Sequence, residues 1–348
     1  MDTAVMLGHG SGGSMMKRII DEVFFAADAG EELRRGDDAA VLDFGTQADV
    51  PVLAPGERLA FSTDSFVVTP HFFPGGDIGR LAICGTVNDV ATSGARPRYL
   101  SCGFILEEGF PMADLRRICE SMAEVAREAG VALVTCDTKV VNKGHGDGVF
   151  INTTGIGVVP SGVNLGGAEI RPGDAVLVSG TLGDHGITIM SCREGLGFSA
   201  DIKSDAAPLN HLIAEVLAAA PHTRAFRDPT RGGLASTLNE FAAQAGVDIT
   251  VEEDAIPVKD AVRGACDMLG YDVLQVANEG KMVCVVPAEE AEAALAAMRA
   301  NVYGRDAAII GTVSAARPDR GPKAFVRTAF GGVRTLDMLV GEQLPRIC

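Results

Sequence analysis

The sequence predicts an α+β protein of two domains with a short C-terminal tail. The chain has 348 residues, more than the about 100 to 200 residues that one hydrophobic core usually organises. From residue 58 onward helical and strand-like hydrophobic patterns alternate, and a Gly- and Pro-containing stretch at 160–173 interrupts them. These observations divide the chain into a Gly-rich N-terminal segment (1–45), an N-terminal domain (46–160), a C-terminal α+β domain (161–335) and a flexible tail (336–348).

The N-terminal half is expected to mix strands and helices. A Gly/Ser-rich loop at 8–14 precedes a helical pattern at 15–27, and such a loop is flexible enough to lie over a ligand. The clearest helix covers 114–129, because its apolar residues share one face and Gly130 follows at the C-cap position. The other expected elements are strands over 58–68, 99–106, 131–135 and 149–159, a helix over 78–93 and a polar turn over 136–148.

The C-terminal half repeats this alternation after the interruption. Strands are expected over 175–179, 247–251, 282–286, 307–313 and 324–329, and helices over 209–219, 234–245, 258–269 and 288–300. Residues 341–348 contain Gly and Pro but show no hydrophobic periodicity. We therefore expect a mobile tail that adds nothing to the core.

Composition excludes several classes of function. The chain has 46 acidic and 30 basic side chains, a formal net charge of −16, which disfavours binding to nucleic acid or to anionic lipid. The N-terminus lacks the features of a secretory signal, and no run approaches the about 20 apolar residues that span a bilayer, so we expect a cytoplasmic protein without membrane association. Eight cysteines without a C-x-x-C pair indicate neither a disulfide framework nor a zinc knuckle.

Aspartates recur in Gly-containing turns and at the ends of predicted strands. They are Asp37, Asp38, Asp64, Asp89 and Asp137. Each one alone is explained by the preference of Asp for turns and helix caps. As a set, short carboxylates on the ends of rigid elements suit Mg²⁺, which takes oxygen ligands and bridges to phosphates.

Glycine-rich turns are the candidate phosphate-binding elements. Neither a P-loop nor a dinucleotide-binding Gly-x-Gly-x-x-Gly turn occurs in the chain. The turns at 8–13, at 180–186 and at Gly232-Gly233 offer backbone N–H groups, and the last of these opens a predicted helix, whose N-terminus favours anions. The alternative for each is an ordinary tight turn.

Several of these motifs resemble a known superfamily. The run from Asn88-Asp89 to Pro97 resembles the superfamily of aminoimidazole ribonucleotide synthetase, selenophosphate synthetase and thiamine-monophosphate kinase. Over nearly the full length, the chain resembles the HypE family of hydrogenase maturation proteins within it. The residues that carry this resemblance lie at 9–13, 61–65, 72–76, 100–104, 137–141, 178–186, 228–233, 277–281 and 345–348. The four-residue ending Pro-Arg-Ile-Cys is the most specific; one departure is Cys136, where relatives usually have Gly.

The resemblance implies a PurM-like architecture and a homodimer. The N-terminal domains would pair through their sheets, and residues 46–160 would bind ATP and Mg²⁺ near that interface. The partner HypF would load a carbamoyl group onto the terminal thiol, and a HypC–HypD scaffold would receive the cyanide product. The residues implied to bind the cofactor are Asp37, Asp38, Thr63, Asp64, Asn88, Asp89, Asp137, Thr138, Asp228, Gly232 and Gly233, with the five aspartates already named as metal ligands.

The implied reaction is the ATP-dependent dehydration of an S-carboxamide to a thiocyanate on the terminal cysteine, Cys348. Phosphoryl transfer depends on positioning and charge neutralisation, which suits the aspartates, Mg²⁺ and Lys139. Proton removal needs a general base, for which the candidates are Glu279, His185 and His9. We favour Glu279, because it lies beside Lys281 in a predicted turn before a strand; the alternatives are a solvated turn carboxylate and loop or cap histidines.

Other functions remain open at this stage. The nearest is another ATP-using activity of the superfamily, such as a selenophosphate synthetase or a small-molecule kinase. A selenophosphate synthetase is disfavoured because it is expected to have a Cys near a Lys in the N-terminal loop, whereas no cysteine here precedes Cys84. A different class is a metallochaperone that uses Cys348 as a ligand, but one thiol is a poor metal site, and an ATP hydrolysis assay would separate the two classes.

Overall fold

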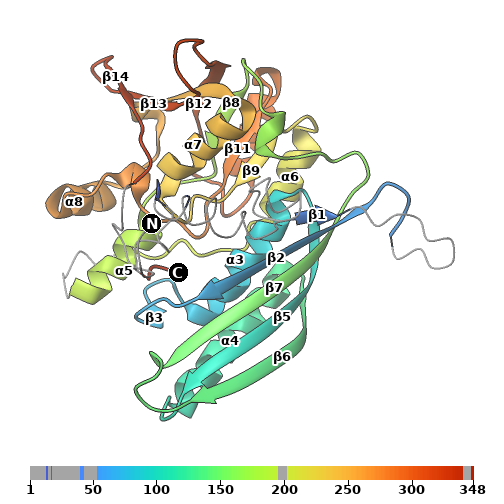
Figure 1. Ribbon diagram of the computed structural model, residues 1–348, viewed down its shortest axis with the longest axis vertical. Coiled ribbons are helices and arrows are strands. Elements are labelled where there is room, and N and C mark those ends of the chain that lie inside the picture. The colour runs from blue at the N-terminus through green and yellow to red at the C-terminus, as the bar shows by residue number, and fades with distance from the viewer. Residues whose placement is uncertain (1–12, 15–16, 18–39, 43–52, 195–201, 340–345) are drawn as a thin grey trace.

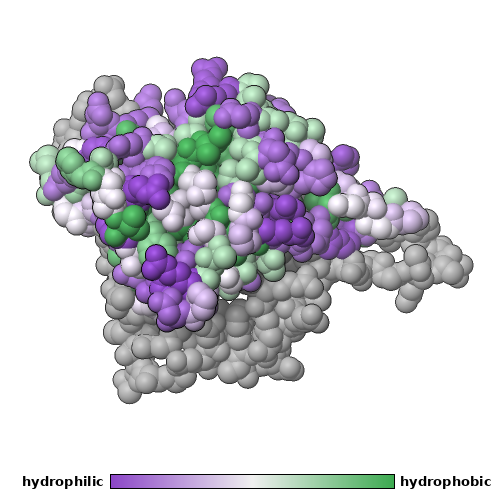
Figure 2. Space-filling view, turned by 90° about the horizontal axis from the view of Figure 1, so that it is seen from above, coloured by the Kyte–Doolittle hydropathy of each residue, from purple (hydrophilic) through white to green (hydrophobic). Residues whose placement is uncertain are grey.

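The computed structural model describes residues 13, 14, 17, 40–42, 53–194, 202–339 and 346–348. Within these residues the chain forms a five-stranded sheet, a seven-stranded sheet and a two-stranded hairpin, and helices pack against the two large sheets (Figure 1). Hydrophilic and hydrophobic residues are interspersed over the end of the molecule formed by the C-terminal domain (Figure 2). None of the helices in these residues is long and apolar enough to cross a membrane.

The N-terminal domain is a five-stranded sheet with helices on one face. Its strands lie in the order β1 (Ala40–Leu42), β2 (Arg58–Phe66), β7 (Val149–Val159), β5 (Arg96–Glu107) and β6 (Ala132–Val141), with β5 and β6 parallel and the other pairs antiparallel. The helices are α3 (Ile78–Thr92) and α4 (Met112–Ala129), and a short hairpin of β3 (Phe72–Phe73) and β4 (Gly76–Asp77) precedes α3.

Both predicted helices of this domain are confirmed. Asp77 caps α3 by accepting a hydrogen bond from the Arg80 backbone N–H at 2.9 Å. The helix is buried on nearly all sides, because it packs against the sheet, α4 and the C-terminal domain. As predicted, α4 ends at Gly130, whose φ of 70° is the left-handed conformation that terminates helices.

Strand β6 is longer than predicted. The sequence favours a polar turn beginning at Cys136, but the strand continues to Val141 and the turn covers only 142–148. The prediction is wrong for 136–141, because β6 is the edge strand of its sheet and its polar side chains can point into water.

The C-terminal domain is a seven-stranded mixed sheet with helices on both faces. The strands lie in the order β14 (Val333–Thr335), β13 (Ala324–Arg327), β10 (Val247–Glu252), β12 (Ala308–Ala315), β8 (Ala175–Val178), β11 (Val283–Val286) and β9 (Ala225–Arg227). The helices are α5 (Asp184–Glu194), α6 (Asn210–Ala219), α7 (Gly233–Ala245), α8 (Asp260–Leu269) and α9 (Ala291–Ala300). One face packs against α7 and the other against α6 and α9, so all four residues of β8 are buried.

Helix α5 has no counterpart among the predicted elements. Its N-terminal residues are buried on several sides; Ile187 and Ile189, for example, are both fully buried. A helix buried on several sides lacks the one-sided hydrophobic pattern by which helices are found in sequences, and the Gly-rich turn before it favoured a loop. The short strands β9 and β14 were also missed.

The end of the tail packs into the molecule. Ile347 is 6% exposed and belongs to the core cluster that includes Phe66, Ile118 and Ile187. The expectation that the tail adds nothing to the core is therefore wrong for Ile347. In Figure 1 the C-terminus lies between α5 and the strands of the N-terminal domain.

Candidate active site around Cys348

The backbone of the last two residues is held by groups from both domains. The Val67 N–H, just after β2, donates to an oxygen of the terminal carboxylate of Cys348 at 3.0 Å. The Nε2 atom of His185, in the first turn of α5, lies 2.8 Å from the Ile347 carbonyl oxygen. A buried carbonyl needs a donor, so the tail is fixed at the two residues that determine where the thiol lies.

The thiol of Cys348 lies beside Arg231, in the loop before α7. The Arg231 side chain bonds to the thiol, and its Nη2 atom also lies 3.1 Å from Oδ1 of Asp64 on β2. Burial raises the pKa of Cys348, Arg231 opposes the rise, and the carboxylates of Glu279 and Asp64 add to it, so that the pKa is about 12. The docked thiol is therefore neutral at pH 7 and a weak nucleophile.

Glu279 is a buried carboxyl group whose charge acts on the Cys348 thiol. It is 2% exposed, and its Oε1 atom has no hydrogen-bond partner among the described residues. Burial raises its pKa well above the ordinary value, the charges of Asp228, Asp64 and Asp205 add to the rise, and Arg231 opposes it. A carboxyl group with a raised pKa is a stronger base when ionised, as proton transfer near neutral pH requires.

The backbone around Glu279 is fixed from both sides. Its N–H donates to Oδ1 of Asp205 at 3.0 Å, and its carbonyl accepts from Nδ2 of Asn88, on α3, at 3.3 Å. Asn88 also donates to the Ala207 carbonyl at 3.0 Å and accepts from the Leu209 N–H at 2.7 Å. Asn88 is fully buried and joins the two domains beneath the site, and its contact with a nucleotide stays a prediction.

His185 has its ring nitrogens occupied. Nδ1 lies 2.8 Å from the Ser204 hydroxyl, Nε2 contacts the tail, and burial lowers the pKa of the ring. A neutral, fully buried imidazole with two partners is suited to hold the Ile347 carbonyl. The structure thus favours His185 as an anchor for the tail over its predicted role as a base.

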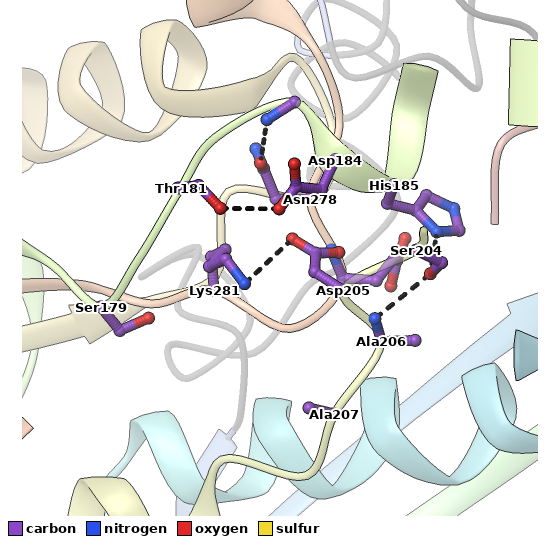
Figure 3. Close-up of polar contacts among 12 residues, drawn as sticks. Ser179, Thr181, Asp184, His185, Ser204, Asp205, Ala206, Ala207, Asn278 and Lys281 are labelled. Carbon is purple, nitrogen blue, oxygen red and sulfur yellow. Dashed lines mark hydrogen bonds and ion pairs between the residues drawn. The ribbon is translucent and has the colours of Figure 1, made fainter. Parts of the chain in front are cut away.

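Polar contacts join the 278–281 loop to Asp205 and to the turn before α5 (Figure 3). Lys281 Nζ lies 3.5 Å from Oδ2 of Asp205, the residue that holds the Glu279 N–H. Asn278 Oδ1 accepts from the Gly183 N–H at 2.7 Å, and this ties the loop to the turn before α5. These contacts give the loop one defined position.

Gly232 and Gly233 form the predicted turn that opens α7. Gly233 has a φ of +60°, and a Cβ atom there would lie 2.7 Å from the carbonyl oxygens of Leu274 and Val276. Only glycine fits so close to that backbone. The first N–H groups of α7 have no side-chain cap, so anion binding at this turn stays a prediction.

Most of the other predicted residues lie on β2, α3 or β6, or outside the described residues. Asp89 accepts from the Ser62 hydroxyl at 2.9 Å, and Thr63 is exposed on β2. Asp137, Thr138 and Lys139 are exposed on β6, where Lys139 Nζ pairs with the Asp137 carboxylate at 2.6 Å. Strands β2 and β6 have two strands between them, a separation of roughly 14 Å at standard strand spacing. His9, Asp37 and Asp38 lie outside the described residues.

A magnesium site does not form from the described members of the predicted set. Asp64, Asp89 and Asp137 lie on separate elements, and Asp64 is paired with Arg231. Among the residues whose positions are described, no three His, Cys, Asp or Glu side chains gather in a way that could hold a metal ion. The described carboxylates therefore do not form a complete site by themselves, and the sharing of Mg²⁺ between Asp64, Asp89 and the phosphates of ATP stays a prediction.

The sequence reasoning missed Arg231 and Asp205 as site residues. Arg231 lies in the Asp-Pro-Thr-Arg-Gly-Gly run, which drew attention only for its Asp and Gly residues. Asp205 lies in a segment without any recognised motif. Arg231 and Asp205 are recognised as site residues only from their contacts with the tail and with the 278–281 loop in the folded protein.

Comparison with known proteins finds similarity both to models of a protein family and to individual proteins. Models of the AIR synthase related protein family match residues 36–159 with the N-terminal domain and 171–321 with the C-terminal domain. "Carbamoyl dehydratase HypE" of Azotobacter vinelandii is 57% identical over 99% of this chain and 97% of its own length. The protein of that name from Escherichia coli K12 is 51% identical over 99% of both chains.

Solved structures agree with the sequence comparisons. A crystal structure of the hydrogenase maturation protein HypE in complex with ATP is 50% identical, with a TM-score of 0.82 over 99% of this chain and 100% of that one. A crystal structure of a HypE–HypF complex contains a chain that is 47% identical, with a TM-score of 0.84 over 92% of this chain and 99% of that one.

Proposed function

The chain belongs to the HypE family of carbamoyl dehydratases, within the AIR synthase related proteins, and we propose that it catalyses the ATP-dependent dehydration of an S-carboxamide on Cys348 to a thiocyanate. The product would supply the cyanide ligands of the iron in NiFe hydrogenases. The observation that carries the proposal is the docked tail, which brings the Cys348 thiol to Arg231 and near the buried Glu279. A carrier thiol needs such a place, where water is excluded and a base is at hand.

The chemistry requires two protons to leave the amide nitrogen. The carboxamide oxygen attacks the terminal phosphorus of ATP, ADP leaves, and loss of one N–H proton gives an S-linked imidoyl phosphate. Loss of the second N–H proton then forms the C≡N triple bond as phosphate departs with the former amide oxygen. The net change is removal of one water from the thiol adduct and hydrolysis of ATP to ADP and phosphate.

Glu279 is proposed to take a proton in this sequence. Its unpartnered Oε1 atom and raised pKa support the role. Arg231 would hold the sulfur end of the carboxamide and, by its positive charge, stabilise the negative charge that develops on the oxygen. Asp64 keeps Arg231 in place through the 3.1 Å ion pair.

The raised pKa of Cys348 suggests that the thiol is loaded elsewhere. A neutral buried thiol attacks an acyl donor poorly, because the thiolate is the nucleophile. We propose that HypF carbamoylates Cys348 when the tail is undocked and that docking follows. A solved complex of HypE with HypF supports this partner. We also propose that the cyanide is transferred to a HypC–HypD scaffold and that the protein works in the cytoplasm.

A homodimer through the N-terminal sheets is supported by their open face. Phe61, Ile156 and Tyr99 are register partners on three neighbouring strands, and Phe61 is 44% exposed and Tyr99 54% exposed. Such a row of apolar side chains is typical of a surface that another subunit covers. Lys139 and Asp137 lie towards the edge of this sheet, and we propose that they act at the ATP site in the dimer.

ATP is proposed as the co-substrate, held in part by the N–H groups of Gly232 and Gly233. Mg²⁺ is proposed to bind the phosphates of ATP. Because the described carboxylates do not form its site, none of the steps above passes through the ion.

Intact-mass spectrometry tests the proposal directly. The protein is incubated with a carbamoyl donor, HypF and ATP, and the mass of the full chain is followed. We expect the mass of one carbamoyl group to be added and then the loss of one water that depends on ATP. A metallochaperone would show neither step, and a small-molecule kinase would hydrolyse ATP without modifying Cys348.

A further inference from the structure

The docked tail is held at a third point, by the side chain of Arg346. Its guanidinium donates from Nε and Nη2 to the Val67 carbonyl at 3.2 and 3.1 Å, and Nη1 pairs with the carboxylate of Asp147. Val67 also donates its N–H to the terminal carboxylate of Cys348. One residue of the N-terminal domain therefore contacts both the side chain of Arg346 and the end of the chain.

The backbone of Arg346 is held by the C-terminal domain. Arg193, in the last turn of α5, donates to the Arg346 carbonyl and, through Nε, to the Thr69 carbonyl at 2.5 Å. Arg346 has a φ of 50°, a left-handed conformation that is unfavourable for a residue with a side chain. The conformation turns the chain at the point where Ile347 and Cys348 enter the core, so contacts outside the backbone must maintain it.

The Arg346 contacts differ in burial from those of Cys348. Side chains of Arg346 and Asp147 are 31% and 55% exposed, and Asp147 lies in the 142–148 turn between β6 and β7. Ile347 is buried in the core, and Cys348 packs against the core and is partly buried. The ion pair is thus the part of the docked tail that salt and solvent reach first.

We propose that Arg346 is a positioning residue that latches the tail: its guanidinium, held by Asp147 and the Val67 carbonyl, sets how long Cys348 stays beside Arg231 and Glu279. The latch rests on the proposed function for its purpose, since a carrier tail must both dock and leave. An exposed ion pair suits this task, because it adds a small stabilisation that can be lost without unfolding the core.

Alkylation of Cys348 by iodoacetamide, followed by peptide mapping, measures docking without any catalytic step. Asp147→Asn removes the charge but keeps the shape, and we expect Cys348 to react about two- to fivefold faster. Arg346→Asn removes the guanidinium at a residue type that tolerates the left-handed conformation, and we expect at least about tenfold faster reaction, because charged hydrogen bonds are lost as well. Added salt should speed the reaction of the wild type and have much less effect on Asp147→Asn.

Controls separate the latch from a general loosening of the fold. Glu252→Gln removes another partly exposed pair, the 2.6 Å contact with Arg327 between β10 and β13, and should leave Cys348 unchanged. Cys84 and Cys284 are fully buried and should stay unreactive in every variant. Equal Cys348 reactivity in the wild type, Asp147→Asn and Arg346→Asn would overturn the latch, and so would a parallel rise at Cys84 and Cys284.

Single-turnover dehydration links the latch to the reaction. Protein already carrying the carbamoyl group should lose water more slowly in Asp147→Asn and Arg346→Asn in proportion to the fall in the docked fraction, which is a smaller factor than that of alkylation as long as most of the tail stays docked. A wild type that never forms the thiocyanate would refute the proposed function, yet the alkylation rates would still decide whether Arg346 latches the tail.

Discussion

Replacing Glu279 by Gln separates proton transfer from every other step. The substitution keeps the shape of a side chain that is 2% exposed, and the backbone contacts of residue 279 with Asp205 and Asn88 do not use the carboxyl group. We expect ATP binding and carbamoyl loading to persist, while dehydration slows by ~10² to 10⁴-fold, the usual contribution of a general base. At 1.36 kcal/mol per factor of ten, this corresponds to about 3 to 5 kcal/mol of the barrier.

The same substitution has a second, independent consequence for stability. The folded-state pKa of Glu279 lies above its ordinary value of 4.5, so the folded protein binds this proton more tightly than the unfolded chain. This tighter binding stabilises the folded protein in full below pH 4.5, and the stabilisation is lost as pH rises through the folded-state pKa of Glu279. Glutamine cannot ionise, so Glu279→Gln should become increasingly more stable than the wild type across that window.

Two assays follow these effects. A time course of intact mass shows whether the carboxamide accumulates, and urea unfolding at several pH values gives the difference in free energy of unfolding. Dehydration at the wild-type rate would refute Glu279 as the base. A stability difference that does not change with pH would refute the raised pKa, and loss of carbamoyl loading or ATP binding would mark Glu279 as a structural or docking residue.

Three further predictions concern the residues around it. Cys348→Ala should abolish the modified product while leaving ATP binding intact, and any cyanide adduct that still accumulates in this variant would contradict the carrier role. Asp64→Asn and Asp89→Asn should lower ATP affinity in a Mg²⁺-dependent manner, as read by nucleotide titration; Asp64→Asn should in addition slow dehydration, because it frees Arg231 from its 3.1 Å ion pair. Arg231→Gln should slow dehydration about tenfold or more, because a charged hydrogen bond is lost. It should also raise the pKa of both Cys348 and Glu279, so the pH–rate profile of dehydration should shift to higher pH. An unchanged profile would argue against contact between Arg231 and the reacting group.

The predicted elements that were confirmed are those with strong local signals. Helix α4 was predicted with its C-cap because its apolar face and Gly130 are both local features. The buried strands β8 and β11 were predicted because short apolar runs are typical of strands covered on both faces. The family was likewise predicted from motifs that lie within short stretches of the chain.

The site depended on contacts between residues far apart in the chain. Cys348 meets Arg231, and Ile347 meets His185, only after the tail has folded back across both domains. No local pattern encodes this, because the tail is docked by side chains and carbonyls from α5, β2 and the 142–148 turn, each placed by its own sheet. For the same reason the sequence suggested a free tail and an exposed thiol, whereas the tertiary structure packs Cys348, partly buried, against the core and raises the pKa of its thiol.

What the sequence by itself determined is therefore the chemistry available to this protein: a terminal thiol, a set of acidic and basic side chains, and Gly-rich turns in a recognisable order. Only the tertiary structure decided which of them meet. Burial sets the pKa of Glu279 and Cys348 and assigns His185 to the tail, because the desolvation of a group depends on everything packed around it and not on its neighbours in the chain.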